Sequence, residues 1–179
     1  MVTDNVFLRV TRRLEGSDRL DPVVRVADPL AGRLVANPGL RRFFHGDATG
    51  IPPHVIATDV PFGAWFMAIF LDLFPDEGTR QASTRLVALG VAAAAPTGIS
   101  GWAEWARADR ATRRVGVVHA AANLAATLIF LASWAARKRN RHGLGVNLAR
   151  LGGALLIVGG FLGGYMRSRR APEPVHPHR

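Results

Sequence analysis

Six polar residues stand within or at the edges of otherwise apolar stretches, and their types could carry chemistry. The set comprises two imidazoles, two carboxylates, a carboxamide and a phenol: His54, His119, Asp59, Glu104, Asn123 and Tyr165. Imidazoles and carboxylates can ligate a metal ion or relay protons, and two imidazoles can hold a haem iron. His119 and Asn123 are four residues apart, so a helix would place both on one face.

The apolar stretches around these residues are as long as membrane-spanning helices, which need about 20 residues each. Four segments nearly free of charged residues have this length: residues 54–74, 86–105, 115–136 and 144–166. A soluble bundle would show a charged stripe repeating about every 3.6 residues, and residues 87–100 and 115–136 lack one. The sequence therefore predicts an all-α fold, an integral membrane four-helix bundle over residues 51–166.

Basic residues are distributed unevenly over the segments that flank the predicted spans. With four spans, the N-terminal segment, the second loop and the C-terminal tail share one side and carry sixteen Arg residues. The other side carries six basic residues, including Lys138. Because cytoplasmic loops hold the excess of Lys and Arg, we expect both termini to be cytoplasmic. The expected location is the bilayer of a bacterial plasma membrane, with residues 167–179 as a cytoplasmic tail.

Residues 1–50 form the basic segment that precedes the first span. Asp21-Pro22, Asp28-Pro29 and Asn37-Pro38 each place a capping side chain before a proline, a pattern typical of helix starts. We expect short amphipathic helices on the cytoplasmic surface of the membrane, and the alternative is a disordered basic tail. The net charge is +10, but the arginines are spread out and match no nucleic-acid motif, so nucleic acid is not an expected partner.

The predicted topology places all six polar residues in the cytoplasmic leaflet. Ionisable groups at that depth are costly and usually need partners. A protonated His119 would relieve the repulsion between Asp59 and Glu104, so we expect these three side chains to converge in a buried network. Asn123, His54 and Tyr165 would surround them. The alternative is that each side chain reaches the headgroups separately.

Small residues repeat at four-residue spacing in the later spans and predict close helix packing. In the second span the repeat includes Gly90 and Gly98. In the fourth span two overlapping pairs have this spacing: Gly159 with Gly163, and Gly160 with Gly164.

The absence of cysteine excludes disulfides, thiolate metal sites and an iron–sulfur cluster held by this sequence. No nucleophile elbow, phosphate-binding glycine loop or metalloprotease helix is present, so catalysis is not expected.

Several short motifs are similar to a known family. They occur at residues 44–46, 58–65, 71–73, 95–97, 100–105, 114–119 with Asn123, and 160–164. Together they resemble the uncharacterised bacterial membrane-protein family called domain of unknown function 2231, over about residues 40–166. The resemblance implies four spans, and some members are fused to or encoded beside a Rieske iron–sulfur domain. This sequence lacks one His and one Pro that the family often has before the first span. Glu104 stands where the family usually has Asp, and Tyr165 stands where it often has His.

Three hypotheses for the function remain open at this stage. The first is a non-enzymatic accessory or structural subunit of a membrane complex, linked to redox chemistry by the resemblance, or a homo-oligomer. The second is a small transport or proton-relay protein that uses Asp59, Glu104 and His119. The third is a module that binds haem b or a metal ion through His54 and His119, although no cofactor is the first expectation.

Overall fold

The structure, a computed structural model, describes residues 6–74 and 76–169 and has no strand in that part of the chain. Within it, eight α-helices follow one another: α1 (Val6–Glu15), α2 (Asp21–Leu34), α3 (Pro38–His45), α4 (Pro53–Ala57), α5 (Asp59–Leu71), α6 (Glu77–Trp105), α7 (Arg110–Lys138) and α8 (His142–Ser168). A 3-10 turn over Asp18–Leu20 joins α1 to α2.

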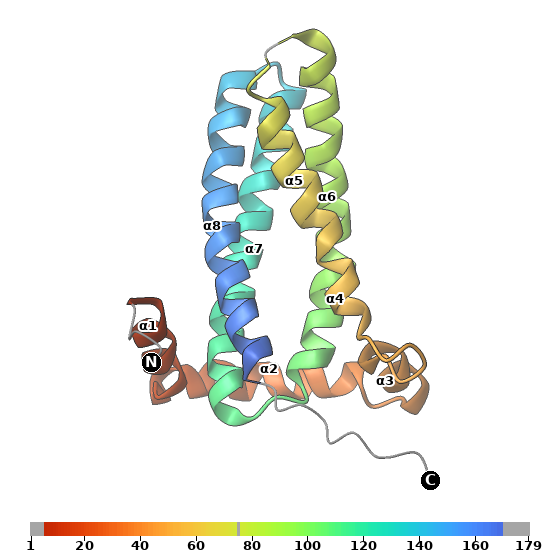
Figure 1. Cartoon of the computed structure of the whole chain (residues 1–179), viewed down its shortest axis with the longest axis vertical. Helices are drawn as coiled ribbons and strands as arrows, with labels where there is room; N and C mark the ends of the chain where they lie inside the picture. The colour runs from red at the N-terminus through yellow and green to blue at the C-terminus, as the bar shows by residue number, and fades with distance from the viewer. Residues whose placement is uncertain (1–5, 75, 170–179) are drawn as a thin grey trace.

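The helices α5 to α8 run side by side along the long axis of the molecule, and α4 continues the line of α5 (Figure 1). Four helical segments are long and apolar enough to cross a membrane: Pro53–Leu71, Glu77–Trp105, Arg110–Lys138 and His142–Ser168. The predicted all-α membrane bundle is therefore confirmed. The N-terminal ends of α6 and α7 lie further out than the apolar pattern indicates, because both helices continue into polar residues.

Two aspartates fix the beginnings of these long helices. The side chain of Asp76 accepts a hydrogen bond from the backbone N–H of Thr79 at 3.0 Å, and Asp109 accepts one from Thr112 at 2.9 Å. Each carboxylate satisfies an amide that has no partner inside its helix. These hydrogen bonds, led by those to the backbone N–H groups, lower the pKa of both aspartates.

The first span is interrupted at Thr58, between α4 and α5. Pro61 falls in the first turn of α5 and has no backbone N–H. The hydroxyl of Thr58 donates to the carbonyl of His54 at 2.7 Å at this point. The backbone stays helical through Thr58, so Pro61 interrupts one helical segment, because it cannot donate to the carbonyl of Ala57, which accepts from Thr97 instead.

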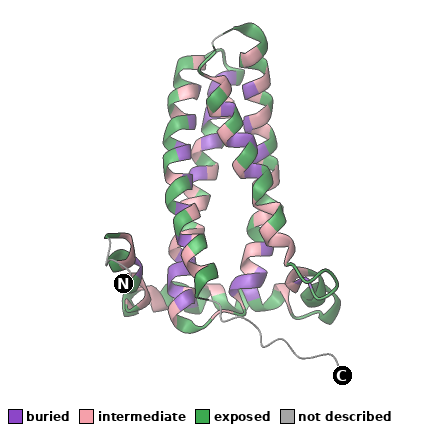
Figure 2. Cartoon of the chain, in the orientation of Figure 1, coloured by how far each residue is buried: buried purple, intermediate pink, exposed green. Residues whose placement is uncertain are grey.

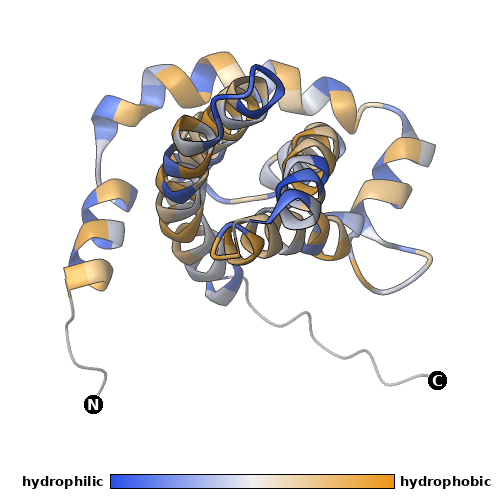
Figure 3. Cartoon of the chain, turned by 90° about the horizontal axis from the view of Figure 1, so that it is seen from above, coloured by the Kyte–Doolittle hydropathy of each residue, from blue (hydrophilic) through white to orange (hydrophobic). Residues whose placement is uncertain are grey.

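The helices α1 to α3, which we call the collar (residues 6–45), lie across one end of the bundle (Figure 1). Seen along the bundle axis, they form an arc around it in which polar and apolar residues alternate (Figure 3). Asn37 caps α3 as predicted, by accepting from Gly39 at 2.8 Å. The expected start at Asp28-Pro29 is wrong, because α2 continues through Pro29 and loses only one hydrogen bond there.

Buried residues gather at two levels of the molecule (Figure 2). The cluster far from the collar is built around Trp65 and Phe130, whose rings stack with centroids 4.2 Å apart. The cluster at the collar joins Val24 and Ala31 of α2 to Trp105 of α6. The collar is thus packed onto the bundle through its own apolar face.

Candidate functional site

A polar layer lies between the two apolar clusters along the helices. It consists of side chains that make hydrogen bonds between neighbouring helices at this level, His54 of α4, Thr97 and Ser100 of α6 and His119 of α7, together with Asn123, which hydrogen-bonds to His119 within α7. Three of the six residues singled out in the sequence belong to it.

His119 connects α7 to α8. Its Nδ1 lies 2.8 Å from the carbonyl oxygen of Gly159, so the Nδ1–H donates this hydrogen bond. The amide nitrogen of Asn123 donates to the carbonyl of His119 at 3.0 Å and lies 3.1 Å from its Nε2. The structure therefore brings together the two residues that the four-residue spacing places on one face.

His54 connects α4 to α6. Its Nδ1 lies 3.1 Å from the carbonyl oxygen of Thr97 and 3.3 Å from the hydroxyl of Ser100. The hydroxyl of Thr97 in turn donates to the carbonyl of Ala57 at 3.1 Å. One imidazole thus comes from the α4–α6 side of the bundle and the other from the α7–α8 side.

Asp59 is exposed and does not join the polar layer. The buried residues of α5 are Pro61, Ala64, Trp65 and Ala68, which form one face of the helix. At about 100° per residue, Asp59 lies about 160° away from Pro61 around the helix axis. The expected convergence of Asp59 with Glu104 and His119 is therefore not met, because the helical phase turns Asp59 outward.

Glu104 and Tyr165 lie at the collar end of the bundle. Glu104 is 2% exposed and belongs to the buried face of α6. Tyr165 packs edge-on against Phe7 of α1, with ring centroids 6.2 Å apart. The phenol ring therefore helps to hold α1 against α8, a role that the sequence did not indicate because α1 was not predicted as a helix.

Four of the six glycines expected to mediate packing do lie against another helix. A Cβ at Gly163 would come 3.0 Å from Cε1 of His119, and one at Gly159 would come 2.6 Å from Oδ1 of Asn123. A Cβ at Gly160 would come 3.1 Å from Cζ of Phe62, and Gly90 lies directly against the indole of Trp65. These glycines make room for the imidazole, the amide and the aromatic rings.

The other two expected packing glycines, Gly98 and Gly164, are exposed, and a Cβ added at either would meet no described atom within 4 Å. A four-residue step turns by about 40° around a helix, so a repeat of three such residues drifts off one face. Gly98 is two steps from Gly90 and faces outward for this reason. Gly164 lies beside the outward-facing edge of α8, one residue beyond the contact made by Gly163.

A buried ion pair that sequence reasoning missed lies at the end opposite to the collar. The guanidinium of Arg137 donates to the two carboxylate oxygens of Asp72 at 2.7 and 2.5 Å. It also donates to the hydroxyls of Ser83 at 2.8 Å and Ser133 at 3.2 Å. The side chains of Arg137 and Asp72 are 0% and 4% exposed. The available signal was a carboxylate near one end of a span and an arginine at the same end of another.

A second missed group of ion pairs holds the collar to α7. Arg114 donates to Asp21 at 2.8 and 2.9 Å and also pairs with Asp18. Arg110 donates to Asp21 at 2.6 Å, and Arg113 donates to Asp28 at 2.7 Å. These contacts join the start of α7 to the collar, and the sequence did not indicate them.

The arginines shift the ionisation of the group that they share. Hydrogen bonds from Arg114 and Arg110 hold the pKa of Asp21 well below its usual range. Asp21 therefore stays ionised at neutral pH and remains available to pair with both arginines.

The described residues contain no group of three or more His, Asp or Glu side chains that could hold a metal ion.

Comparison with known proteins decides the family. The family model described as "Predicted membrane protein (DUF2231)" matches residues 50–171. The chain belongs to this family. No curated protein and no solved structure matches it. The family assignment confirms the resemblance seen in the motifs, and with the four candidate spans it makes this DUF2231 chain a multi-pass membrane protein. The matched region begins after the collar, so the collar is a feature that lies outside it.

Proposed function

We propose that this chain is a non-enzymatic accessory subunit of a membrane complex and that the collar is the surface on which a partner docks. The observation that carries the proposal is the set of ion pairs between the collar and α7. A basic tail needed only for topology would have no reason to hold Asp21 and Asp28 in place. The contacts instead give the collar a fixed position at the end of the bundle.

The helix α2 presents three distinct faces that suit this role. Val24, Ala27 and Ala31 face the bundle. Val23, Val26 and Leu30 form a second stripe that is 52%, 70% and 58% exposed, apolar enough to enter the membrane interface. The third stripe runs along the remaining side at four-residue spacing: Arg25, Pro29 and Arg33. This cationic stripe would meet an acidic surface of a partner.

Cross-linking in native membranes, followed by native gel electrophoresis, tests this proposal. The chain should migrate in a complex larger than its own mass, and Arg25→Glu with Arg33→Glu should release it. Arg139→Glu, at an exposed position at the far end of the bundle, is the matched control and should leave the complex intact. A wild-type chain that migrates alone, or equal losses in both variants, would contradict the proposal. Because the resemblance implies a link to Rieske domains, a redox complex is the first partner to test.

A specific observation favours haem b binding as a second candidate function. Both imidazoles are held through Nδ1 by backbone carbonyls, of Thr97 and of Gly159. This arrangement fixes the ring and leaves Nε2 as the atom that can ligate iron. If a haem were bound here, His54 and His119 would hold its iron through Nε2, and the haem would supply one-electron transfer. Asn123, whose amide lies 3.1 Å from Nε2 of His119, would have to turn aside.

The optical spectrum of the purified protein tests the second candidate. Reduced protein with a bis-imidazole haem would show the Soret and α bands of a b-type cytochrome, and His54→Ala or His119→Ala would remove them. His45→Ala, outside the polar layer, is the control. Protein that takes up no haem on reconstitution would exclude this function and leave the accessory role untouched.

We further propose that the chain lies in the plasma membrane with the collar on the cytoplasmic side. Sixteen basic residues on the collar side against six on the other support this orientation. The contact of Arg169 with Glu15 of α1, at 3.1 Å, puts the end of α8 on the same side as the collar.

A further inference from the structure

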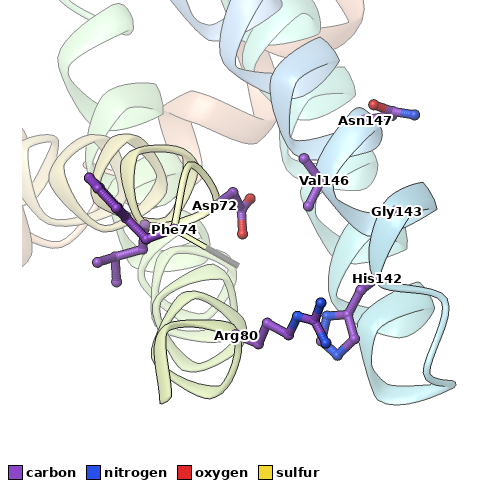
Figure 4. Close-up of a pocket in the computed structure, with 8 residues that line it drawn as sticks. Asp72, Phe74, Arg80, His142, Gly143, Val146 and Asn147 are labelled. Atoms are coloured by element: carbon purple, nitrogen blue, oxygen red, sulfur yellow. The ribbon is translucent and has the colours of Figure 1, made fainter. Parts of the chain in front are cut away.

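A cavity of about 280 Å³ lies at the end of the bundle opposite to the collar (Figure 4). Leu71, Asp72 and Phe74 at the end of α5 form one wall. His142, Gly143 and Val146 at the start of α8 form the other, and Arg80 reaches in from α6. The cavity is therefore bordered by three of the four spans at the level where each of them leaves the membrane.

The charge that faces this cavity is positive. Asp72 lines it, but both of its carboxylate oxygens accept hydrogen bonds from Arg137, which neutralises it. Arg80 is exposed and extends toward His142 (Figure 4). The Nδ1 of His142 is buried, and no described residue hydrogen-bonds to it. The cavity thus has an exposed guanidinium and an imidazole nitrogen that makes no hydrogen bond within the described residues.

The start of α8 adds to this preference. Its N-cap residue, Arg141, makes no side-chain hydrogen bond to the first amides of the helix. In α6 and α7 an aspartate occupies this position and satisfies an amide. The partial positive charge at the beginning of α8 therefore acts in the same direction as Arg80 and His142.

Arg150 provides an independent reason to place an anion here. Val146 lines the cavity, and Gly153 of α8 lies against Ile69 of α5, which defines a seam between these two helices. Arg150 is four residues after Val146 and three before Gly153, so it borders this α5–α8 seam. Arg150 is exposed within a candidate span. It lies eight residues into α8, about 12 Å from the helix start. An exposed arginine at that depth must reach up to an anion at the headgroup level.

We infer that this cavity binds the phosphate group of an anionic phospholipid. The phosphate lies between Arg80 and His142 at the mouth of the cavity, and Arg150 reaches it from below along the α5–α8 seam. The acyl chains extend over the lipid-facing side of the same seam, where Arg150 and the exposed Ile157 and Phe161 form one stripe of α8. A guanidinium suits this ligand because it forms charge-assisted hydrogen bonds to phosphate oxygens.

Thermal unfolding and native mass spectrometry of the full chain in detergent test the inference. Phosphatidylglycerol should raise the unfolding temperature and remain bound as a discrete adduct. Arg80→Gln and Arg150→Gln should each weaken the apparent affinity by about tenfold, the value of one charge-assisted hydrogen bond. Both residues are exposed, so the unfolding temperature without lipid should change little and the variants remain testable.

Arg85→Gln is the matched control, an exposed arginine on α6 that does not line the cavity. It should bind phosphatidylglycerol as the wild type does. Equal losses in Arg85→Gln and Arg80→Gln would reduce the effect to net charge and overturn the site. Equal stabilisation by phosphatidylcholine would remove the requirement for an anionic lipid. Equal stabilisation by glycerol 3-phosphate would show that a soluble phosphate, not a lipid, is the ligand. Either of these two results overturns the inference.

Discussion

Large and polar side chains in the bundle lie against glycines of neighbouring helices. Trp65 lies against Gly90, and Phe130 lies against Gly152. The polar groups follow the same rule, since Asn123 is seated on Gly159. Helices in lipid gain little from burying apolar surface against each other, so close approach at small residues is what holds them together.

Two alanine substitutions in α8 should have opposite effects for this reason. Alanine favours a helix over glycine by about 1 kcal/mol, so Gly164→Ala, where the added methyl meets nothing, should stabilise slightly. Gly159→Ala would place a Cβ 2.6 Å from Oδ1 of Asn123 and should cost about 1–3 kcal/mol of overpacking. Unfolding temperatures in detergent measure both. A stabilised Gly159→Ala variant would show that this face of α8 is not a helix contact.

Removing one partner of the Asp72–Arg137 ion pair should destabilise the fold strongly, whereas removing both partners together should destabilise it much less. Arg137→Met leaves a buried carboxylate without its cation and should cost about 3–5 kcal/mol of stability. Asp72→Leu combined with Arg137→Met removes both charges and should recover most of that loss. The exposed Arg139→Met is the control for loss of charge alone. If the double variant loses as much free energy of unfolding as the two single variants combined, the two side chains do not interact.

At the scale of the element, the collar differs from the spans in what holds it. The spans are long and apolar, and their packing depends on glycines and stacked rings. The collar is held by a short apolar contact at Val24 and Ala31 and by charge pairs to α7. Ion pairs respond to pH, whereas glycine packing does not, so the two parts of the molecule should respond differently to acid.

Docking of the collar onto its own bundle, through the ion pairs with α7, should persist near neutral pH and weaken in acid. Because docking lowers the pKa of Asp21, the docked state binds a proton less tightly than the released state. Docking is therefore fully favoured above the ordinary aspartate pKa of about 3.9 and weakens as the pH falls further. Amide hydrogen exchange of α2, corrected for the intrinsic rate at each pH, should rise only below that value.

Asp21→Asn separates this effect from general acid unfolding. It should release α2 at neutral pH while exchange in α7 and α8 stays slow. Glu77→Gln, at the far end of the bundle, is the control. Fast exchange of α2 in the wild type at neutral pH would contradict the role of the ion pairs.

At the scale of the whole molecule, the sequence predicted the spans well and the site only in part. Segregation of charge alone locates four spans, since lipid tolerates no charged stripe. The pairing of His119 with Asn123 follows from local spacing. The outward turn of Asp59 depends on helical phase, which becomes readable only once the interruption at Thr58 is known. The partnership of Asp72 with Arg137 joins residues 65 positions apart, which no local pattern can reveal.

We propose that the four spans cross the membrane with the collar on the cytoplasmic side. The native sequence has no cysteine, so single cysteines can be placed without background. Ala36→Cys lies between α2 and α3, and Arg139→Cys lies at the end of α7, both exposed. A membrane-impermeant maleimide should label Ala36→Cys only in inside-out vesicles and Arg139→Cys only in right-side-out vesicles. Labelling of both positions from the same side would contradict the account.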